Sequence, residues 1–267
     1  MAPADLQRLP GDLWGRFRSE QNARIVKNHA AAIHEVDPEV RVGICGPAYL
    51  DYTARRGMDI RLFEPEVVIH APMIYVVGTT YEQQIRSTCE NTTAPVLPFL
   101  LASDLAVEQV FPLPDDVRLN MLATALSGGR GAILWVGIES LDGQYLQALR
   151  RSMEEIRELE PYILGGQRAA DVRIQGDAGE GRAVRVDGRT VMVTQRNELS
   201  PLRWWEWRSA KGRLAGLINY DRESSHAARI SGEGVAKARA LFGPTPRLDG
   251  GEALVELGPC EFGAYVW

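Results

Sequence analysis

Hydrophobic residues form four strand-length runs in the first half of the chain, and each run is followed by a stretch with helical periodicity. The runs begin at residues 40, 67, 96 and 132, so their starts lie 27, 29 and 36 residues apart. A strand, a loop, a covering helix and a return loop need roughly that length. The alternation therefore predicts a parallel sheet built from four βα units. The predicted strands are Val40–Cys45, Val67–Tyr75, Val96–Ala102 and Ala132–Ile138.

The stretches that flank these runs predict helices with one apolar face. Asp12 can cap a first helix, which Asp37 and Pro38 end. The later helices are indicated by apolar side chains that recur at steps of three and four residues. These stripes are Tyr81, Ile85 and Cys89, then Leu119, Leu122 and Leu126, and finally Leu146, Leu149, Met153, Ile156 and Leu159.

Four βα units amount to half of a (β/α)8 barrel, which needs eight strands to close. The runs are apolar on both faces, as expected for strands with helices on one side and a barrel core on the other. A four-stranded piece leaves two open sheet edges and an uncovered inner face. Three explanations stay open: further sequence before Met1, two copies that pair as a homodimer to complete a barrel, or a marginally folded chain.

The pattern changes after Gly165 to short runs of alternating polarity without strong helical periodicity. We expect a partial barrel domain at residues 1–165 and an antiparallel β-sandwich domain at residues 166–267. Asp187-Gly188 between two short apolar runs is a hairpin signal, and one helix is expected at Gly234–Leu241. The strands expected here include Val184–Val186, Thr190–Val193, Leu214–Asn219, Ala227–Ile230, Ala253–Leu257 and Phe262–Trp267.

Composition narrows the class of partner. The 267 residues are 45% hydrophobic and 24% charged, which fits a soluble globular protein. A net charge of −5 argues against a nucleic-acid partner, which needs a basic face, and suits a neutral substrate. No apolar run reaches about 18 residues, so we expect no membrane span. The N-terminus lacks the apolar core of a signal peptide, and the compartment stays open.

The three cysteines, Cys45, Cys89 and Cys260, are far apart and lack metal-type spacing. We expect small buried side chains, with a disulfide or a nucleophile as the alternative. The sequence contains no phosphate loop, zinc motif, nucleophile elbow or dinucleotide fingerprint, so we expect no cofactor.

Two carboxylates follow the third and fourth runs, where a (β/α)8 barrel carries its chemistry. Asp104 and Glu139 would end neighbouring strands and could face one cavity. Glycosidases need two carboxylates, one as acid and one as nucleophile or base, so both residues are catalytic candidates. Trp135 shares a strand face with Glu139 and could form a stacking floor for a sugar ring. Alternatively, Trp135 is a core residue, Glu139 starts a solvated loop and Asp104 forms a turn.

Four further residues complete a predicted substrate-binding set with Trp135. Tyr49 follows the first run, Tyr75 ends the second, and Asp142 lies just behind Glu139. His70 lies in mid-strand, so a buried core histidine is the competing interpretation. Its parity differs from that of Tyr75, and both would face the barrel interior only if Pro72 introduced a bulge.

Several segments together resemble the C-terminal part of a (β/α)8 glycoside hydrolase with its trailing β-sandwich domain. Trp14–Phe17 with Asn22 resembles the helix after the fourth barrel strand. The other segments resemble the sixth strand (His70–Tyr75), the seventh (Pro95–Phe99), the start of the eighth (Gly128–Trp135) and the trailing sandwich (Asn219–Asp221 and Phe262–Trp267).

The resemblance implies hydrolysis of a glycoside, but the chain departs from the family pattern. An acid/base carboxylate commonly ends the fourth barrel strand, and that strand would precede Met1. Many retaining members have a Glu at the end of the seventh strand, where this chain has Asp104. A non-catalytic carbohydrate-binding protein and a half-barrel scaffold that dimerises therefore remain alternatives to a glycosidase.

Overall fold

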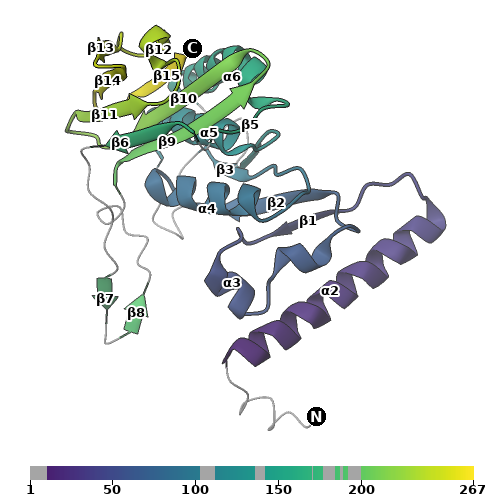
Figure 1. The fold of residues 1–267 in the computed structure, drawn as a ribbon. Coiled ribbons are helices and arrows are strands. Elements are labelled where there is room, and N and C mark those ends of the chain that lie inside the picture. Colours follow the sequence, from purple (N-terminus) through teal and green to yellow (C-terminus); the bar gives the residue numbers. More distant parts are fainter. Residues whose placement is uncertain are drawn as a thin grey trace. The chain divides into compact units, whose positions relative to one another are not determined.

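The computed structural model of the protein describes residues 11–102, 112–135, 142–169, 171–176, 184–186, 189–191 and 200–267 (Figure 1). Its internal contacts divide the chain into two compact units. The first unit comprises Met1–Tyr75, Gln83–Leu100 and Ser127–Trp135, and the second comprises Val76–Glu82, Leu101–Leu126 and Val136–Trp267.

The first unit is organised around a four-stranded parallel sheet in the order β1-β2-β3-β4 (Figure 1). Each strand is shorter than its predicted run. β2, β3 and β4 lie inside their runs, and β1 extends one residue past the end of its run. Helical segments separate the strands along the chain. The predicted alternation of strands and helices is therefore confirmed. The strands are β1 (Gly43–Gly46), β2 (Ile69–Ile74), β3 (Phe99–Leu101) and β4 (Ile133–Trp135).

The helices that accompany these strands begin and end close to the sequence signals. Pro114 occupies the first position of α5, where its missing N–H costs nothing. Tyr81 and Ile85 of α4 and the leucine stripe of α5 are fully buried, as their periodicity predicted. The helical segments are α2 (Gly11–Val36), α3 (Asp51–Arg55), η1 (Ile60–Phe63), α4 (Thr79–Glu90), α5 (Pro114–Ser127) and α6 (Gly143–Ile163).

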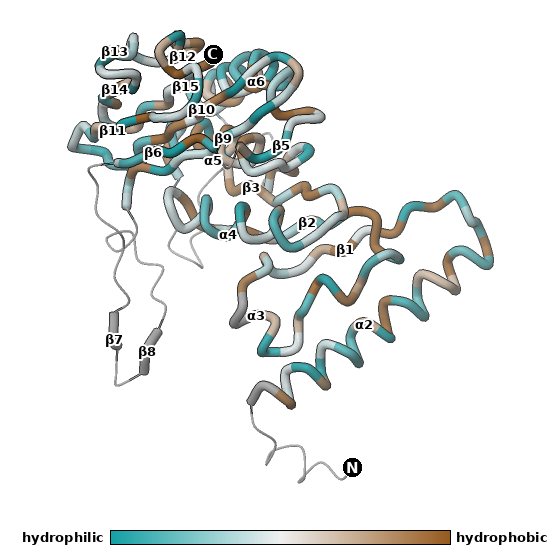
Figure 2. The backbone as a smooth tube through the Cα atoms, viewed as in Figure 1, coloured by the Kyte–Doolittle hydropathy of each residue, from teal (hydrophilic) through white to brown (hydrophobic). Residues whose placement is uncertain are grey.

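Helix α2 is largely hydrophilic (Figure 2). It packs on its neighbours through small residues, among them Gly15 and Ala23. It contacts α3 and η1, and a Cβ at Gly15 would lie only 1.8 Å from the carbonyl oxygen of Arg55. Ala23 of α2 joins a small core beneath the helix. The close approach of α2 to α3 therefore requires glycine at position 15.

The buried face of α6 differs from the predicted one. Leu146 and Met153 were expected to face the core, but they are 49% and 59% exposed. The buried face instead contains Glu155, which forms an ion pair with Arg118 of α5, also buried, at 2.6 Å. The buried residues of α6 are Ala148, Ser152, Glu155, Leu159 and Ile163.

The second unit contains the predicted antiparallel sheets. One sheet has the order β12-β15-β10-β9-β5, and another has the order β13-β14-β11-β6. The β7–β8 hairpin forms where Asp187-Gly188 predicted it. The strands are β5 (Gln167–Arg168), β6 (Arg173–Gly176), β7 (Val184–Val186), β8 (Arg189–Val191), β9 (Leu202–Ser209), β10 (Gly212–Asn219), β11 (His226–Ser231), β12 (Arg239–Phe242), β13 (Arg247–Asp249), β14 (Glu252–Leu257) and β15 (Phe262–Val266).

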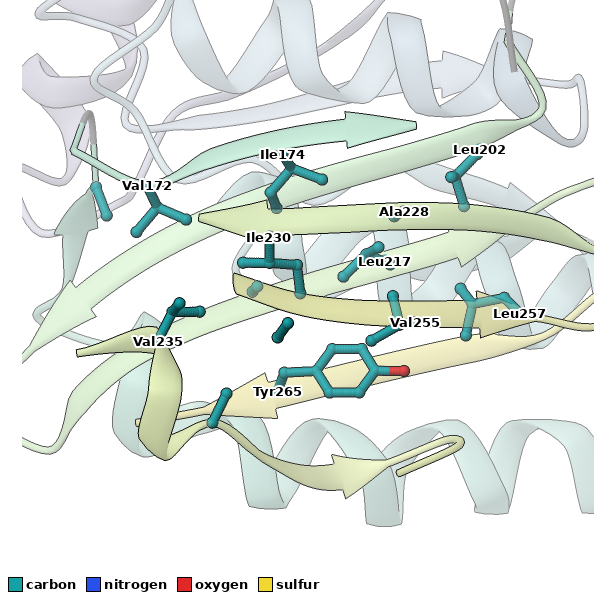
Figure 3. Close-up of a cluster of buried hydrophobic side chains, with 14 residues drawn as sticks. Val172, Ile174, Leu202, Leu217, Ala228, Ile230, Val235, Val255, Leu257 and Tyr265 are labelled. Atoms are coloured by element: carbon teal, nitrogen blue, oxygen red, sulfur yellow. The ribbon is translucent and has the colours of Figure 1, made fainter. Parts of the chain in front are cut away.

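The two larger sheets enclose one hydrophobic core (Figure 3). Leu217 and Tyr265 come from the five-stranded sheet, and Ile230 and Val255 come from the four-stranded sheet. All four side chains are at most 4% exposed. Alternate strand residues fill the space between the sheets, which is the arrangement of a β-sandwich.

The prediction of a helix at Gly234–Leu241 is wrong. Only Val235–Lys237 forms a short 3-10 turn, and Arg239–Phe242 continues as β12. Pairing of β12 with β15 satisfies its backbone hydrogen bonds at the sheet edge. Tertiary pairing therefore overrides the local helical pattern.

The three cysteines are free thiols. Cys45 is exposed, contrary to the expected burial: it pairs with Ala71 and so lies on the sheet face that also carries the exposed Met73. Cys89 and Cys260 are half-buried. The change from helix to antiparallel strands between α6 and β5 falls at the predicted domain boundary, and the domain division itself stays a prediction. Within the described residues, no helix combines the length and the apolar character that crossing a bilayer requires.

Candidate functional site

Three aromatic side chains meet on one face of the parallel sheet of the first unit. Tyr75 follows β2, Phe99 belongs to β3 and Trp135 ends β4. The ring centroids of Tyr75 and Trp135 lie 5.5 Å apart, and those of Phe99 and Trp135 lie 5.9 Å apart. We call these three residues the aromatic shelf.

The register of the strands brings the shelf together. Met73 pairs with Phe99 in the parallel ladder, so their side chains share the face that carries Tyr75 and Trp135. The opposite face carries Ile74 and Leu100, which pair with each other and are fully buried. We call the first of these faces the aromatic face.

The aromatic face is open to solvent. Trp135 is 44% exposed and Met73 is 41% exposed, whereas Tyr75 and Phe99 are half-buried. Burial raises the pKa of the Tyr75 phenol, and the neighbouring Cys45 thiol raises it further. Tyr75 therefore stays a neutral hydroxyl that can donate and accept hydrogen bonds.

A shelf of this kind suits the apolar side of a sugar ring. The π-face of an aromatic ring is electronegative, and it attracts the slightly positive C–H groups that line one side of a pyranose. Trp135 presents the largest such surface, and Tyr75 adds a hydroxyl at its margin. The arrangement can therefore bind and orient a sugar.

His70 lies on the face opposite to the shelf. The pairing of β1 with β2 and of β2 with β3 keeps one register through Pro72, so the bulge that would have brought His70 to the side of Tyr75 is absent. His70 is 2% exposed. Among the described residues its ring nitrogens make no hydrogen bond of ordinary geometry, although the Pro47 backbone contacts the ring. Burial lowers the pKa of His70 to about 4, against the opposing influences of Glu64 and of the Pro47 backbone, which raise it. These features favour a neutral core histidine.

Glu64 is a half-buried carboxylate that was not among the candidates predicted from the sequence. It accepts hydrogen bonds from Thr92 Oγ1, from Thr93 N at 2.9 Å and from Thr93 Oγ1 at 2.5 Å. Burial alone would raise its pKa, but these hydrogen bonds hold the pKa of Glu64 below its usual value. With its oxygens already engaged, Glu64 anchors the loop before β3.

Tyr49 and Asp142 have structural contacts of their own. Tyr49 is 3% exposed and its ring lies 4.9 Å from the Arg61 guanidinium. Asp142 caps α6, because its Oδ1 accepts hydrogen bonds from the backbone N–H groups of Gln144 and Tyr145. Their predicted roles in substrate binding stay predictions.

The predicted catalytic carboxylates, Asp104 and Glu139, lie outside the described residues. Of the predicted set, the structure brings together Tyr75 and Trp135. Sequence reasoning missed Phe99 and Met73, although the strand parity of Phe99 could have been combined with that of Tyr75 if the register had been known. Among the described residues, no group of His, Cys, Asp and Glu side chains could hold a metal ion.

Neither a protein-family model nor a curated protein matches the chain. Solved structures share its fold. An Anoxybacillus alpha-amylase has a TM-score of 0.54 at 11% identity, covering 91% of this chain and 56% of its own. An alpha-amylase from H. orenii has a TM-score of 0.51 at 12% identity, covering 92% of this chain and 57% of its own.

A third structure, a Bacteroides fragilis protein described provisionally as an alpha-galactosidase, has a TM-score of 0.54 at 9% identity. The match covers 90% of this chain and 50% of that protein. The chain therefore spans about half the length of these structures. At these identities the likeness shows the fold: a partial (β/α) barrel followed by antiparallel sheets, as in glycoside hydrolases.

Proposed function

We propose that the chain is a glycoside hydrolase-like protein that acts on a carbohydrate. The observation that carries this proposal is the partly exposed aromatic shelf, in which Tyr75 and Trp135 lie at the C-terminal edge of the parallel sheet with Phe99 beside Trp135. That edge is where (β/α) barrels bind substrates, and an aromatic surface suits a neutral sugar. The likeness in fold to glycoside hydrolases supports the same class.

In this proposal the shelf binds the sugar and two carboxylates perform the chemistry. Trp135 forms the stacking floor and Tyr75 borders it. Asp104 and Glu139, which follow the adjacent strands β3 and β4 in sequence, act as the pair of acid and nucleophile or base that glycoside hydrolysis needs.

Hydrolysis assays on oligosaccharides test the catalytic part of the proposal. We expect Asp104→Asn and Glu139→Gln each to lower turnover by about 100-fold or more, since a positioned general acid or base contributes roughly that much. Glu154→Gln is the matched control, because Glu154 is an exposed carboxylate on α6 paired with Arg150. Wild-type turnover in both candidate variants would remove the assignment of these two residues.

Sugar binding without turnover is the alternative, and it is favoured by a shelf that needs no carboxylate to form. It predicts sugar-dependent quenching of tryptophan fluorescence in the parent chain and in Glu139→Gln, with no product released. An oligosaccharide panel that produces neither quenching nor hydrolysis would contradict both functions.

A further inference from the structure

A cavity of about 630 Å³ lies within the second unit, and none of the residues that line it belongs to the aromatic shelf. Residues of α5, of α6, of the loop after β12 and of the loop before β15 line it. Its volume falls within the range of about 300 to 1,000 Å³ of small-molecule sites.

One side of the cavity contains two guanidinium groups held by a single carboxylate. Arg118 is 5% exposed and donates from Nε and Nη2 to the two oxygens of Glu155 at 2.9 and 2.6 Å. The Arg151 Nε lies 3.3 Å from the same carboxylate. Arg118 and Arg151 both line the cavity, and each guanidinium has five N–H donors, more than the contacts with Glu155 use.

Hydrogen-bond acceptors stand beside these donors. Asp115 at the start of α5 is exposed, and Glu261 uses Oε2 to accept from the Gly258 backbone N–H at 2.6 Å. The lining therefore has two guanidinium groups and three carboxylates, Asp115, Glu155 and Glu261. The carboxylates oppose an anionic ligand and the guanidinium groups oppose a cationic one, so the charges favour a neutral ligand rich in hydroxyl groups.

The remaining wall is apolar. The rings of Phe242 and Phe262 lie 5.9 Å apart at an angle of 35°, and Pro244 and Pro259 border them. A hydroxylated ligand that also has a C–H face can lie against this wall while its hydroxyl groups reach the charged side.

The backbone at the cavity rim is held in an unusual conformation. Cys260 has a φ of 50°, in the left-handed region that few residues other than glycine adopt. A hydrogen bond from its N–H to the Asp221 carbonyl at 2.8 Å fixes it there. Such conformations persist where the surroundings determine them, and they cluster at binding sites.

From this lining we infer that the cavity is a second carbohydrate-binding site, which takes a neutral sugar unit without hydrolysing it. Arg118 and Arg151 donate to the sugar hydroxyls, Asp115 and Glu261 accept from them, and Phe242 packs against the ring. The choice of a sugar agrees with the proposed function but does not depend on hydrolysis or on the aromatic shelf.

Saturation-transfer NMR with methyl glucoside, glucuronate and glucosamine tests the inference on a Trp135→Ala background, which silences the shelf. We expect methyl glucoside to give the strongest signal. Arg151→Gln should weaken its binding about tenfold, since a hydrogen bond to a charged group contributes roughly that factor. Arg150→Gln is the matched control on the same helix, because Arg150 is exposed, pairs with Glu154 and is not among the residues that line the cavity.

Three results would overturn the inference: no binding of any probe at millimolar concentration, equal binding by Arg151→Gln and the control, or a preference for glucuronate or glucosamine. If the aromatic shelf does not bind sugar, this result is unchanged, because the background variant already lacks the Trp135 side chain. Conversely, failure of the cavity to bind leaves the hydrolysis assays of the proposed function unaffected.

Discussion

At the residue scale, Trp135 is the side chain on which sugar recognition by the shelf depends. We expect Trp135→Ala to weaken oligosaccharide binding about five- to tenfold, because aromatic contacts contribute about 0.5–1.5 kcal/mol beyond the area they bury. Isothermal titration measures the change. Leu134→Ala is the control, since Leu134 is similarly exposed at 36% but belongs to the other face of β4. Equal affinities in the two variants would contradict a role for the shelf.

His70 predicts how stability depends on pH. Its pKa in the folded chain is about 4, below the model-peptide value of 6.5, so the unfolded chain takes up the proton first as the pH falls. The free energy of unfolding should therefore decrease between pH 6.5 and pH 4, by up to about 3 kcal/mol, and this contribution should level off below pH 4.

Urea denaturation at pH 7, 5.5 and 4.5 measures this dependence, and His70→Leu isolates it from the carboxylates. The contribution of Glu64 to the free energy of unfolding also falls on acidification, because its pKa is lowered in the folded chain. That loss occurs mainly below pH 4.5, the usual pKa of a Glu side chain. A parent and a His70→Leu variant with the same slope between pH 7 and pH 5.5 would show that His70 is solvated.

The residues of the shelf could be foreseen only in part. Strand parity selected Trp135, and a place at the end of the second run selected Tyr75, because both properties belong to a single strand. The contribution of Phe99 depends on its pairing with Met73, and register between strands cannot be read from a single sequence. The burial of His70 depends on an unbroken register through Pro72, which the sequence left open in the same way.

At the element scale, the packing of α2 depends on a residue without a side chain. Gly15→Ala would gain up to about 1 kcal/mol of helix propensity, but its Cβ would lie 1.8 Å from a backbone oxygen of Arg55. We expect a net loss of about 1–3 kcal/mol, since α2 must move away from α3. Chemical denaturation measures it.

Gly143→Ala provides the control for that experiment, because Gly143 begins α6 and a Cβ there meets nothing within 4 Å. We expect this variant to be at least as stable as the parent. An equally stable Gly15→Ala chain would mean that α2 does not pack closely on α3.

The elements themselves followed from periodicity, and the errors have tertiary causes. The apolar stripe of α6 predicted the buried face only in part: Leu159 is buried, but Glu155, a charged residue, is also buried, against Arg118. Pattern reasoning assigns charged residues to solvent, and buried ion pairs are the exception to that rule. The strand β12 was predicted as helix because its pairing partner, β15, follows it by about 20 residues.

At the scale of the whole molecule, the four parallel strands and the antiparallel sheets agree with the fold class that the sequence predicted. The sheet β1-β2-β3-β4 has two edge strands, β1 and β4. Closure of a (β/α) barrel requires eight strands, and the described residues contribute four, which do not by themselves supply the side chains that fill a complete barrel. Hydrophobic periodicity describes each βα unit separately and says nothing about what covers this face.

The exposed aromatic face predicts self-association. Met73 of β2 is 41% exposed, and Ile133 and Trp135 of β4 are 36% and 44% exposed. Open sheet edges offer unpaired backbone groups to a second chain. Light scattering should therefore give an average mass above the 29.6 kDa of one chain, and that mass should rise with concentration.

Charged substitutions distinguish association through this face from association elsewhere. Met73→Lys and Ile133→Lys should restore the single-chain mass, because a charge on the face opposes its burial against another chain. Val36→Lys is the control, since Val36 is 88% exposed at the end of α2 and lies outside the sheet. A concentration-independent mass of 29.6 kDa for the parent chain would show that the face is stable in water. Loss of association in the Val36→Lys variant instead would move the contact from the sheet to α2.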